Sequence, residues 1–338
     1  MTMPRCKIVD PDLTPWYHVI SRTVRGAYLL EAGDGRRKQE LEERLEQLSK
    51  IFSIEVAGYA VLDNHLHNLV YLDPRRAKRW SKSEVLRRWA QLHPPRGPDR
   101  KPLKSIPQWI QKNVRNQKLV RKLRKRLMNL GWFMKELKEP LARKANEEDG
   151  VRGPFWAGRF KSIAILGEEA VLATCAYIDL NPLAAGMVRL PEEARYTSLR
   201  TRLAWCARQG RLSDLQAVWQ GAVAAVRKLQ GTERGLWLCP LEDRRAQGAS
   251  RVGVLDGFSL GSYLRLVDAT SRLVRPGKAR VGPEVTALLD RLKLSWDTWQ
   301  QTLSQLFARP QLLGVAFSFD RARLLSLIHI SEPTRHTS

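Results

Sequence analysis

The chain has few cysteines and no long apolar run. Its four cysteines, Cys6, Cys175, Cys206 and Cys239, stand singly among 338 residues. They show neither the paired C-x-x-C spacing of a zinc site nor the density of a disulfide scaffold, so we expect them to be reduced. No apolar run approaches the roughly 18 to 20 residues of a membrane helix, and the N-terminus lacks the apolar segment of a secretory signal. We therefore expect a globular protein that stays in the cytoplasm and does not contact a membrane.

Acidic residues are also scarce. There are 34 Asp+Glu against 58 Lys+Arg, which gives a net charge of +24. Between Asp73 and Gly150 the sequence holds 23 Lys+Arg and 8 Asp+Glu, so this stretch carries +15 of the total. A basic protein can simply have a solvated surface, but a localised surplus of this size is typical of proteins with a polyanionic partner. Nucleic acid is the first candidate.

The alternation and spacing of apolar residues predict the elements of one sheet with its helices. In chain order these are a strand at 14–21, a helix at 36–52, strands at 54–62 and 65–72, a helix at 81–92, a strand at 155–166 and a helix at 168–181. The turn-like Asp63-Asn64 should join the second and third strands as a hairpin. The order is that of a ferredoxin-like (RRM-like) fold with one extra helix, so the predicted class is α+β with an antiparallel sheet.

Two regions lie outside this pattern. A Pro-rich connection at 93–107 and a Lys/Arg-dense helical stretch at 110–145 form a predicted basic insertion, at about 93–150. From residue 191 the sequence pattern changes and predicts helical segments at 196–208 and 212–230. A mixed region follows at 231–282, with no recognisable catalytic motif. The tryptophans here are expected to be core residues: Trp205, Trp219, Trp237, Trp296 and Trp299. There are no internal repeats.

The last residues are best excluded. Residues 325–335 match the conceptual translation of a common transposon-based sequencing adaptor, so we expect 325–338 to be an artefact and the natural sequence to depart after Leu324. His329 and His336 are accordingly given no role. Residues 191–324 then form a mostly helical C-terminal region of unknown role.

Two histidines begin the predicted third strand. Alternation places the imidazoles of His65 and His67 on one face and Leu66 on the other, and two ligands on one face can share a metal ion. By itself such a pair is more often two half-buried strand histidines with hydrogen-bond partners. Other motifs in the sequence have to decide between these two interpretations.

A second pair lies on the predicted helix at 168–181. Tyr177 and Asn181 are spaced i and i+4, so they project from one face, one turn apart. Pro182 is expected to end the helix there, because proline disfavours the helical conformation of the residue before it. Taken alone, Tyr177 is more often a packed core tyrosine, and Asn181 is an ordinary helix end.

Together these residues belong to motifs that resemble the REP-associated tyrosine transposases. Residues 61–67 (VLDNHLH), 155–162 (FWAGRFKS) and 177–186 (YIDLNPLAAG) are similar to successive signatures of that family, and 3–5 (MPR) and 17–22 (YHVISR) fit as well. The similarity covers roughly 3–205. The stretch 132–146 resembles the long, helix-inserted branch, which implies a single-tyrosine HUH (His-apolar-His) transposase domain over 3–190.

The resemblance implies a role for each of four residues. His65 and His67 would be metal ligands, Asn181 would supply a third, amide-bearing ligand, and Tyr177 would be the nucleophile. Such an open site of nitrogen and oxygen ligands suits Mg²⁺ or Mn²⁺ better than closed tetrahedral zinc. Attack by Tyr177 on single-stranded or hairpin DNA would leave a 5′-phosphotyrosine and a free 3′-OH, and the reverse reaction would join strands without ATP. Asp63 and Asn68 depart from the family pattern without removing a ligand.

Cationic residues near the motifs are candidate DNA contacts. They are Arg159 and Lys161 beside the site, and the cluster Arg121, Lys122, Arg124, Lys125 and Arg126. Trp109, Trp132 and Trp156 are placed to stack on unpaired bases or to pack in the core.

Two alternatives to a tyrosine nuclease and strand transferase stay open. One is a catalytically inactive DNA- or RNA-binding protein on the same fold, which would not need His65, His67 and Tyr177 together. The other is a nuclease that activates water with a metal and has no use for the tyrosine. The sequence is compatible with a monomer or a homodimer.

Overall fold

The structure is a computed structural model that describes residues 8–32, 34–97, 100–103, 105–274, 297, 299–301 and 303. The predictions for Cys6, Trp296 and the adaptor-like residues 325–338 fall outside these residues. No helix in the described ranges is long and apolar enough to cross a membrane.

Four strands form one antiparallel sheet. They are β1 (Trp16–Arg22), β2 (Ile54–Val61), β3 (His65–Leu72) and β4 (Lys161–Ala164), in the spatial order β2-β3-β1-β4. This is the ferredoxin-like order, which confirms the predicted α+β class. The β2–β3 hairpin is also confirmed, and its turn is closed by a hydrogen bond of 2.9 Å from the Leu62 amide to the His65 carbonyl.

The fourth strand is shorter than the predicted 155–166. Residues 155–160 do not pair as a strand, although Trp156 makes an isolated antiparallel bridge with Thr23. The Trp156 indole is buried and donates to the Lys138 carbonyl at 3.1 Å. The aromatic residues of this segment therefore pack against a helix rather than extending the sheet.

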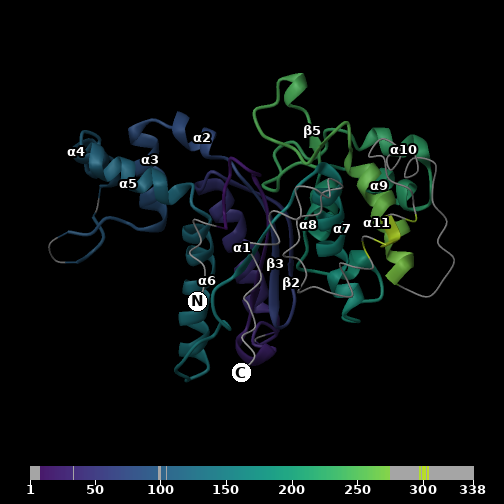
Figure 1. Cartoon of the computed structure of the whole chain (residues 1–338), viewed down its shortest axis with the longest axis horizontal. Coiled ribbons are helices and arrows are strands. Elements are labelled where there is room, and N and C mark those ends of the chain that lie inside the picture. The colour runs from purple at the N-terminus through teal and green to yellow at the C-terminus, as the bar shows by residue number, and fades with distance from the viewer. Residues whose placement is uncertain are drawn as a thin grey trace, which may run out of the picture.

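Helices cover both faces of the sheet (Figure 1). Helices α1 (Arg36–Ile51) and α6 (Leu130–Glu148) pack together on one face, over Val19 of β1 and Val70 of β3. Helix α7 (Glu168–Ala184) lies on the opposite face, over Ile20 and Leu69. Because neighbouring residues of a strand point to opposite faces, each strand serves both layers.

The stretch predicted as one helix at 110–145 is three helices. Helix α4 (Ile106–Asn113) is followed by α5 (Gln117–Leu127) and then α6. Asn116 and Asn129 interrupt the stretch, because their side chains accept hydrogen bonds from the Leu119 and Trp132 amides and so begin new helices. Helix α3 (Lys82–Leu92) matches the prediction, while the short α2 (Pro74–Arg79) was not predicted because six residues show too little periodicity.

Helix α7 does not end before Pro182, as the sequence suggested. The missing proline N–H removes one hydrogen bond, and the helix continues to Ala184. It ends where Gly186 adopts a φ of +71° and the Gly186 and Met187 amides bond back to the Leu183 and Pro182 carbonyls, both at 3.0 Å. This Schellman motif, rather than the proline, sets the boundary.

The C-terminal region covers the outer side of α7 (Figure 1). It contains α8 (Ser198–Arg208), α9 (Leu212–Trp219), α10 (Val223–Lys228) and α11 (Leu260–Val274), with a small parallel pair of β5 (Glu242–Asp243) and β6 (Leu255–Asp256). The helix predicted at 212–230 is broken at Gly221, whose φ is +96°. Trp299 is buried, as predicted, and Trp205 and Trp237 are half-buried.

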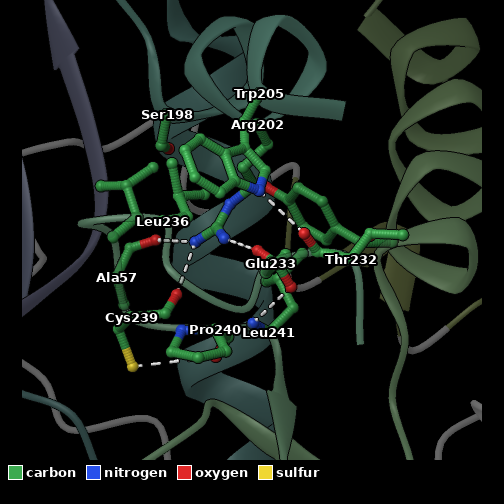
Figure 2. A network of polar contacts seen from close by, with 12 residues as sticks. Ala57, Ser198, Arg202, Trp205, Thr232, Glu233, Leu236, Cys239, Pro240 and Leu241 are labelled. Atoms are coloured by element: carbon green, nitrogen blue, oxygen red, sulfur yellow. Dashed lines mark hydrogen bonds and ion pairs between the residues drawn. The ribbon is translucent and has the colours of Figure 1, made fainter. Parts of the chain in front are cut away.

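A buried ion pair joins this region to the sheet (Figure 2). Arg202 of α8 pairs with Glu233 and donates to the carbonyls of Ala57 at 2.8 Å and Cys239 at 2.9 Å. The other Glu233 oxygen accepts from the Leu241 amide at 2.9 Å. One guanidinium thus connects α8, strand β2 and the chain that leads to β5.

We predict that Arg202→Met destabilises the protein by about 3–5 kcal/mol, because it leaves the Glu233 carboxylate buried without its cation. The double variant Arg202→Met/Glu233→Leu should recover much of this loss, and Arg208→Met on the exposed side of α8 should change little. Urea denaturation measures all three. A single variant as stable as the wild type would show that the pair does not hold the C-terminal region in place.

Candidate active site between the sheet and helix α7

Strands β1 and β3 place polar side chains on the face that α7 covers. Ile20 pairs with His67 and Arg22 pairs with His65 in the β1–β3 register. Because paired residues share a face, His18, Arg22, His65 and His67 all lie on the α7 side. Alternation thus places the two predicted histidines together, as the sequence indicated.

His67 is almost fully enclosed, with 1% of the residue exposed. Its Nδ1 lies 2.9 Å from His18 Nε2, and the two rings stack with centroids 5.1 Å apart. Its Nε2 is buried and has no hydrogen-bond partner in the described part of the chain. A buried polar atom without a partner costs free energy unless a ligand supplies one.

His65 lies beside His67 and nearer the edge. The ring centroids are 4.8 Å apart, and His65 Nδ1 is 2.6 Å from the Asn64 side-chain oxygen. Burial, and then the positive charge of Arg22, lower the pKa of His65 to about 4, against a smaller opposing effect of a hydrogen bond with Asn181. The imidazole is therefore neutral at pH 7, the form that binds a metal ion.

Helix α7 supplies Tyr177 and Asn181, one turn apart. The Tyr177 ring is 5.6 Å from the His67 ring and 5.9 Å from the His18 ring, and 2% of the residue is exposed. Asn181 hydrogen-bonds with both Tyr177 and His65. The amide therefore links the tyrosine of the helix to a histidine of the sheet.

Burial raises the pKa of Tyr177 above its ordinary value. The hydrogen bond with Asn181 and the charge of Arg22 oppose this effect. The hydroxyl is protonated at neutral pH, and Asn181 and Arg22 are the neighbours that favour its ionised form. An anion formed at this oxygen would have a cation and an amide close by.

Besides Arg22, sequence reasoning missed His18 at this site. It is fully buried, its Nε2 contacts His67, and its own Nδ1 has no hydrogen-bond partner among the described residues. Its position is where it can fix the orientation of the His67 ring, as neighbours of metal-binding histidines do. Strand alternation was the available signal, because His18 precedes Arg22 by four positions on β1 and so shares its face.

The donor atoms fit an open metal site. His67 Nε2 is buried and unpaired, His65 is neutral, and the Asn181 side chain adds an amide oxygen beside them. Such a mixed set of nitrogen and oxygen donors is suited to Mg²⁺ or Mn²⁺. Within the described residues no group of three or more His, Cys, Asp and Glu is arranged to hold a metal ion, so the closed site of structural zinc is not formed there.

Two predicted DNA contacts flank the site. Lys161 of β4 pairs with Ile20, which in turn pairs with His67, so the lysine is in the same row and on the same face. It is exposed, as is Arg159 just before it. At about 4.8 Å between strands, Lys161 is roughly 10 Å from the His67 position.

The predicted cluster on α5 divides into two groups. Arg121, Lys122 and Lys125 are exposed. Arg124 instead donates to the Ala77 and Trp80 carbonyls, and Arg126 stacks over Trp132 at 4.1 Å. The last two side chains therefore hold neighbouring elements, and Trp132 and Trp109 are half-buried rather than open to bases.

Comparisons with known proteins give one structural likeness. No protein-family model and no curated protein matches the chain. Among solved structures, the chain is similar to a REP-associated tyrosine transposase bound to a REP hairpin, at 15% identity and a TM-score of 0.33, over 56% of this chain and 78% of that one. At that TM-score the likeness says nothing about the chemistry of this chain, and the family stays a resemblance based on motifs.

His18 makes a pH-dependent contribution to stability that can be measured. Burial lowers its pKa to about 3, from 6.5, so the unfolded chain takes up a proton as the pH falls below 6.5 while the folded protein does not. Stability is therefore fully present above pH 6.5 and is lost as the pH falls toward 3, by about 2 kcal/mol at pH 5 from this residue. His18→Gln should show a correspondingly smaller difference between urea denaturation at pH 7 and pH 5. Equal differences in the two proteins would contradict the assignment.

Proposed function

We propose that the protein is a metal-dependent endonuclease and strand transferase for single-stranded or hairpin DNA, with Tyr177 as its nucleophile. The observation that carries the proposal is the meeting of Tyr177, Asn181, His65 and His67 between β3 and α7, from motifs more than a hundred residues apart. A tyrosine, an amide and two neutral imidazoles in contact are the groups that such a reaction needs.

In the proposed reaction the Tyr177 hydroxyl attacks a phosphodiester phosphorus. The bond from the tyrosine oxygen to phosphorus forms, the bond from phosphorus to the 3′-oxygen breaks, and the tyrosine proton ends on the leaving 3′-oxygen. The products are a 5′-phosphotyrosine and a strand with a free 3′-OH. Because the phosphotyrosine keeps the energy of the broken bond, attack by another 3′-OH reverses the step and joins strands.

His65, His67 and Asn181 are the residues proposed to hold Mg²⁺ or Mn²⁺. When bound, the ion would polarise the scissile phosphate and offset its negative charge. Asn181 has a second part in this proposal, since its hydrogen bond with Tyr177 lowers the pKa of the hydroxyl against the effect of burial. Arg22 acts in the same direction by its charge. His18, whose Nε2 contacts His67 Nδ1, would hold the His67 ring so that its Nε2 could serve as a ligand.

Positive charge near the site would hold the strand. Lys161 shares the sheet face with His67, and Arg159 precedes it, so both are proposed to contact the phosphates that flank the cut. The exposed residues Arg121, Lys122 and Lys125 of α5 would add contacts farther away, with Arg124 and Arg126 supporting that helix from within.

The main competing function is a binding protein without catalysis on the same sheet. It leaves the unpaired Nε2 of His67 unexplained, because a protein that only binds DNA gains nothing from a buried imidazole nitrogen without a partner. A nuclease that activates water would use the ion but not Tyr177. The experiment below separates all three.

We expect a covalent protein–DNA adduct when the purified protein is incubated with Mn²⁺ or Mg²⁺ and labelled single-stranded DNA from the flanks of its own gene. Denaturing gels should show the label at protein mass. Tyr177→Phe should abolish the adduct, and His65→Ala and Asn181→Ala should lower its rate by at least tenfold through weaker metal binding. Tyr71→Phe, at the far end of β3, serves as the matched control and should behave as the wild type does.

Each other result points to a different function. Cleavage that persists in Tyr177→Phe would mean hydrolysis by water. Binding without cleavage in every protein, over a range of metal ions and flanking sequences, would favour the binding protein. An adduct formed equally well in His65→Ala would remove that histidine from the proposed ligand set.

A further inference from the structure

Helices α2 to α5 carry most of the excess charge of the protein. They occupy residues 74–129, which we call the basic lobe, and Figure 1 shows them together at one side of the molecule, away from α7 and the C-terminal region. The lobe contains 19 Lys+Arg and 2 Asp+Glu, so it holds +17 of the net charge of +24. All the other residues together carry only +7. The charge is a property of this lobe rather than of the whole surface.

Two adjacent helices, α2 and α5, bring exposed cations to the surface of the lobe. Helix α5 presents Arg121, Lys122 and Lys125, and α2 presents Arg75, Lys78 and Arg79, all exposed. Arg124 holds the two helices together, because it donates to the Ala77 and Trp80 carbonyls at the end of α2.

Almost nothing in the lobe neutralises this surface. Glu84 is its one acidic residue among the described residues, and it is already paired with Arg87 and Arg88. Like charges on adjacent helices repel each other and lower stability. A bound polyanion would remove that cost, which is the physical reason to expect one here.

The aromatic residues of the lobe show which form of nucleic acid fits. Sites for single strands stack bases on exposed aromatic rings. Here Arg88 lies over Trp80 at 4.2 Å, Trp89 is buried, and Trp109 is half-buried against the core. No Trp, Tyr or Phe is exposed in the described part of the lobe, and the exposed His93 ring packs against Trp89 with ring centroids 4.5 Å apart, so the surface offers cations for phosphates and no free ring of this kind for unpaired bases.

We infer that the basic lobe is a clamp for double-stranded DNA, which binds the phosphates of a duplex stem without reading its sequence and without a metal ion. The inference takes from the proposed function only that the polyanion is DNA. It does not need Tyr177, His65 or His67. A result that contradicts the proposed catalytic function therefore does not contradict this inference, and the reverse also holds.

The test is fluorescence anisotropy of the full chain with a labelled 20-base-pair duplex and with a single strand of equal length, in EDTA and over a series of salt concentrations. The triple variant Arg121→Gln/Lys122→Gln/Lys125→Gln is compared with Arg208→Gln/Arg227→Gln/Arg234→Gln. The second set loses the same charge from exposed positions of the C-terminal region. All six side chains are exposed, so both variants should fold, and circular dichroism checks this.

We expect tighter binding of the duplex than of the single strand, with the same affinity for unrelated duplex sequences. The lobe variant should lower the slope of log affinity against log salt by about 2.7, from three lost phosphate contacts, while the control variant keeps the wild-type slope. Equal slopes in the two variants would overturn the inference, and so would a preference for the single strand. Duplex binding in a protein that forms no covalent adduct would overturn the proposed nuclease and leave the clamp standing.

Discussion

The burial of α7 on nearly every side is the constraint on which the rest of the structure depends. Its apolar residues are not confined to one stripe, and 13 of its 17 residues are buried. A helix of this kind cannot leave the side that faces away from the sheet exposed to water, so a second layer has to cover that side. The C-terminal region is that layer, and for this reason its residues share one core with α7 and the sheet.

The same constraint governs the polar groups of α7. Asp179 points to the outer layer, where it accepts from Ser198 at 2.6 Å, from the Leu199 amide at 2.9 Å and from Tyr263 at 2.6 Å. Burial raises the pKa of this carboxyl, and the three donors oppose the rise. Tyr177 and Asn181 point to the sheet instead. The outer layer thus gives the Asp179 carboxylate three donors, whereas the inner one leaves His67 Nε2 without a described partner.

Local sequence patterns predicted the features that depend on residues close together in the chain. The features that were missed depend on packing between distant segments. Alternation placed His65 and His67 on one face, and helical spacing placed Tyr177 beside Asn181. His18 was missed because its partner is 49 residues away in the chain. The helix end predicted at Pro182 was wrong because the one hydrogen bond that proline removes costs little compared with the stabilisation from the burial of α7. The helix therefore continues to the left-handed position, which Gly186 adopts readily. No local sequence pattern indicated that residues after 191 cover α7.

On the two proposals above, the position of the basic lobe relative to the site limits the DNA that can contact both. The lobe follows β3 directly, since α2 begins at Pro74, whereas His65 is the first residue of that strand. Seven steps of about 3.3 Å place Leu72, at the end of β3 beside the lobe, roughly 23 Å from His65. With a rise of about 3.4 Å per base pair, a duplex has to extend over some seven base pairs to reach from one to the other. A short stem-loop would then touch the lobe or the site but not both at once, while a longer stem held by its phosphates would present the adjoining single strand to Tyr177.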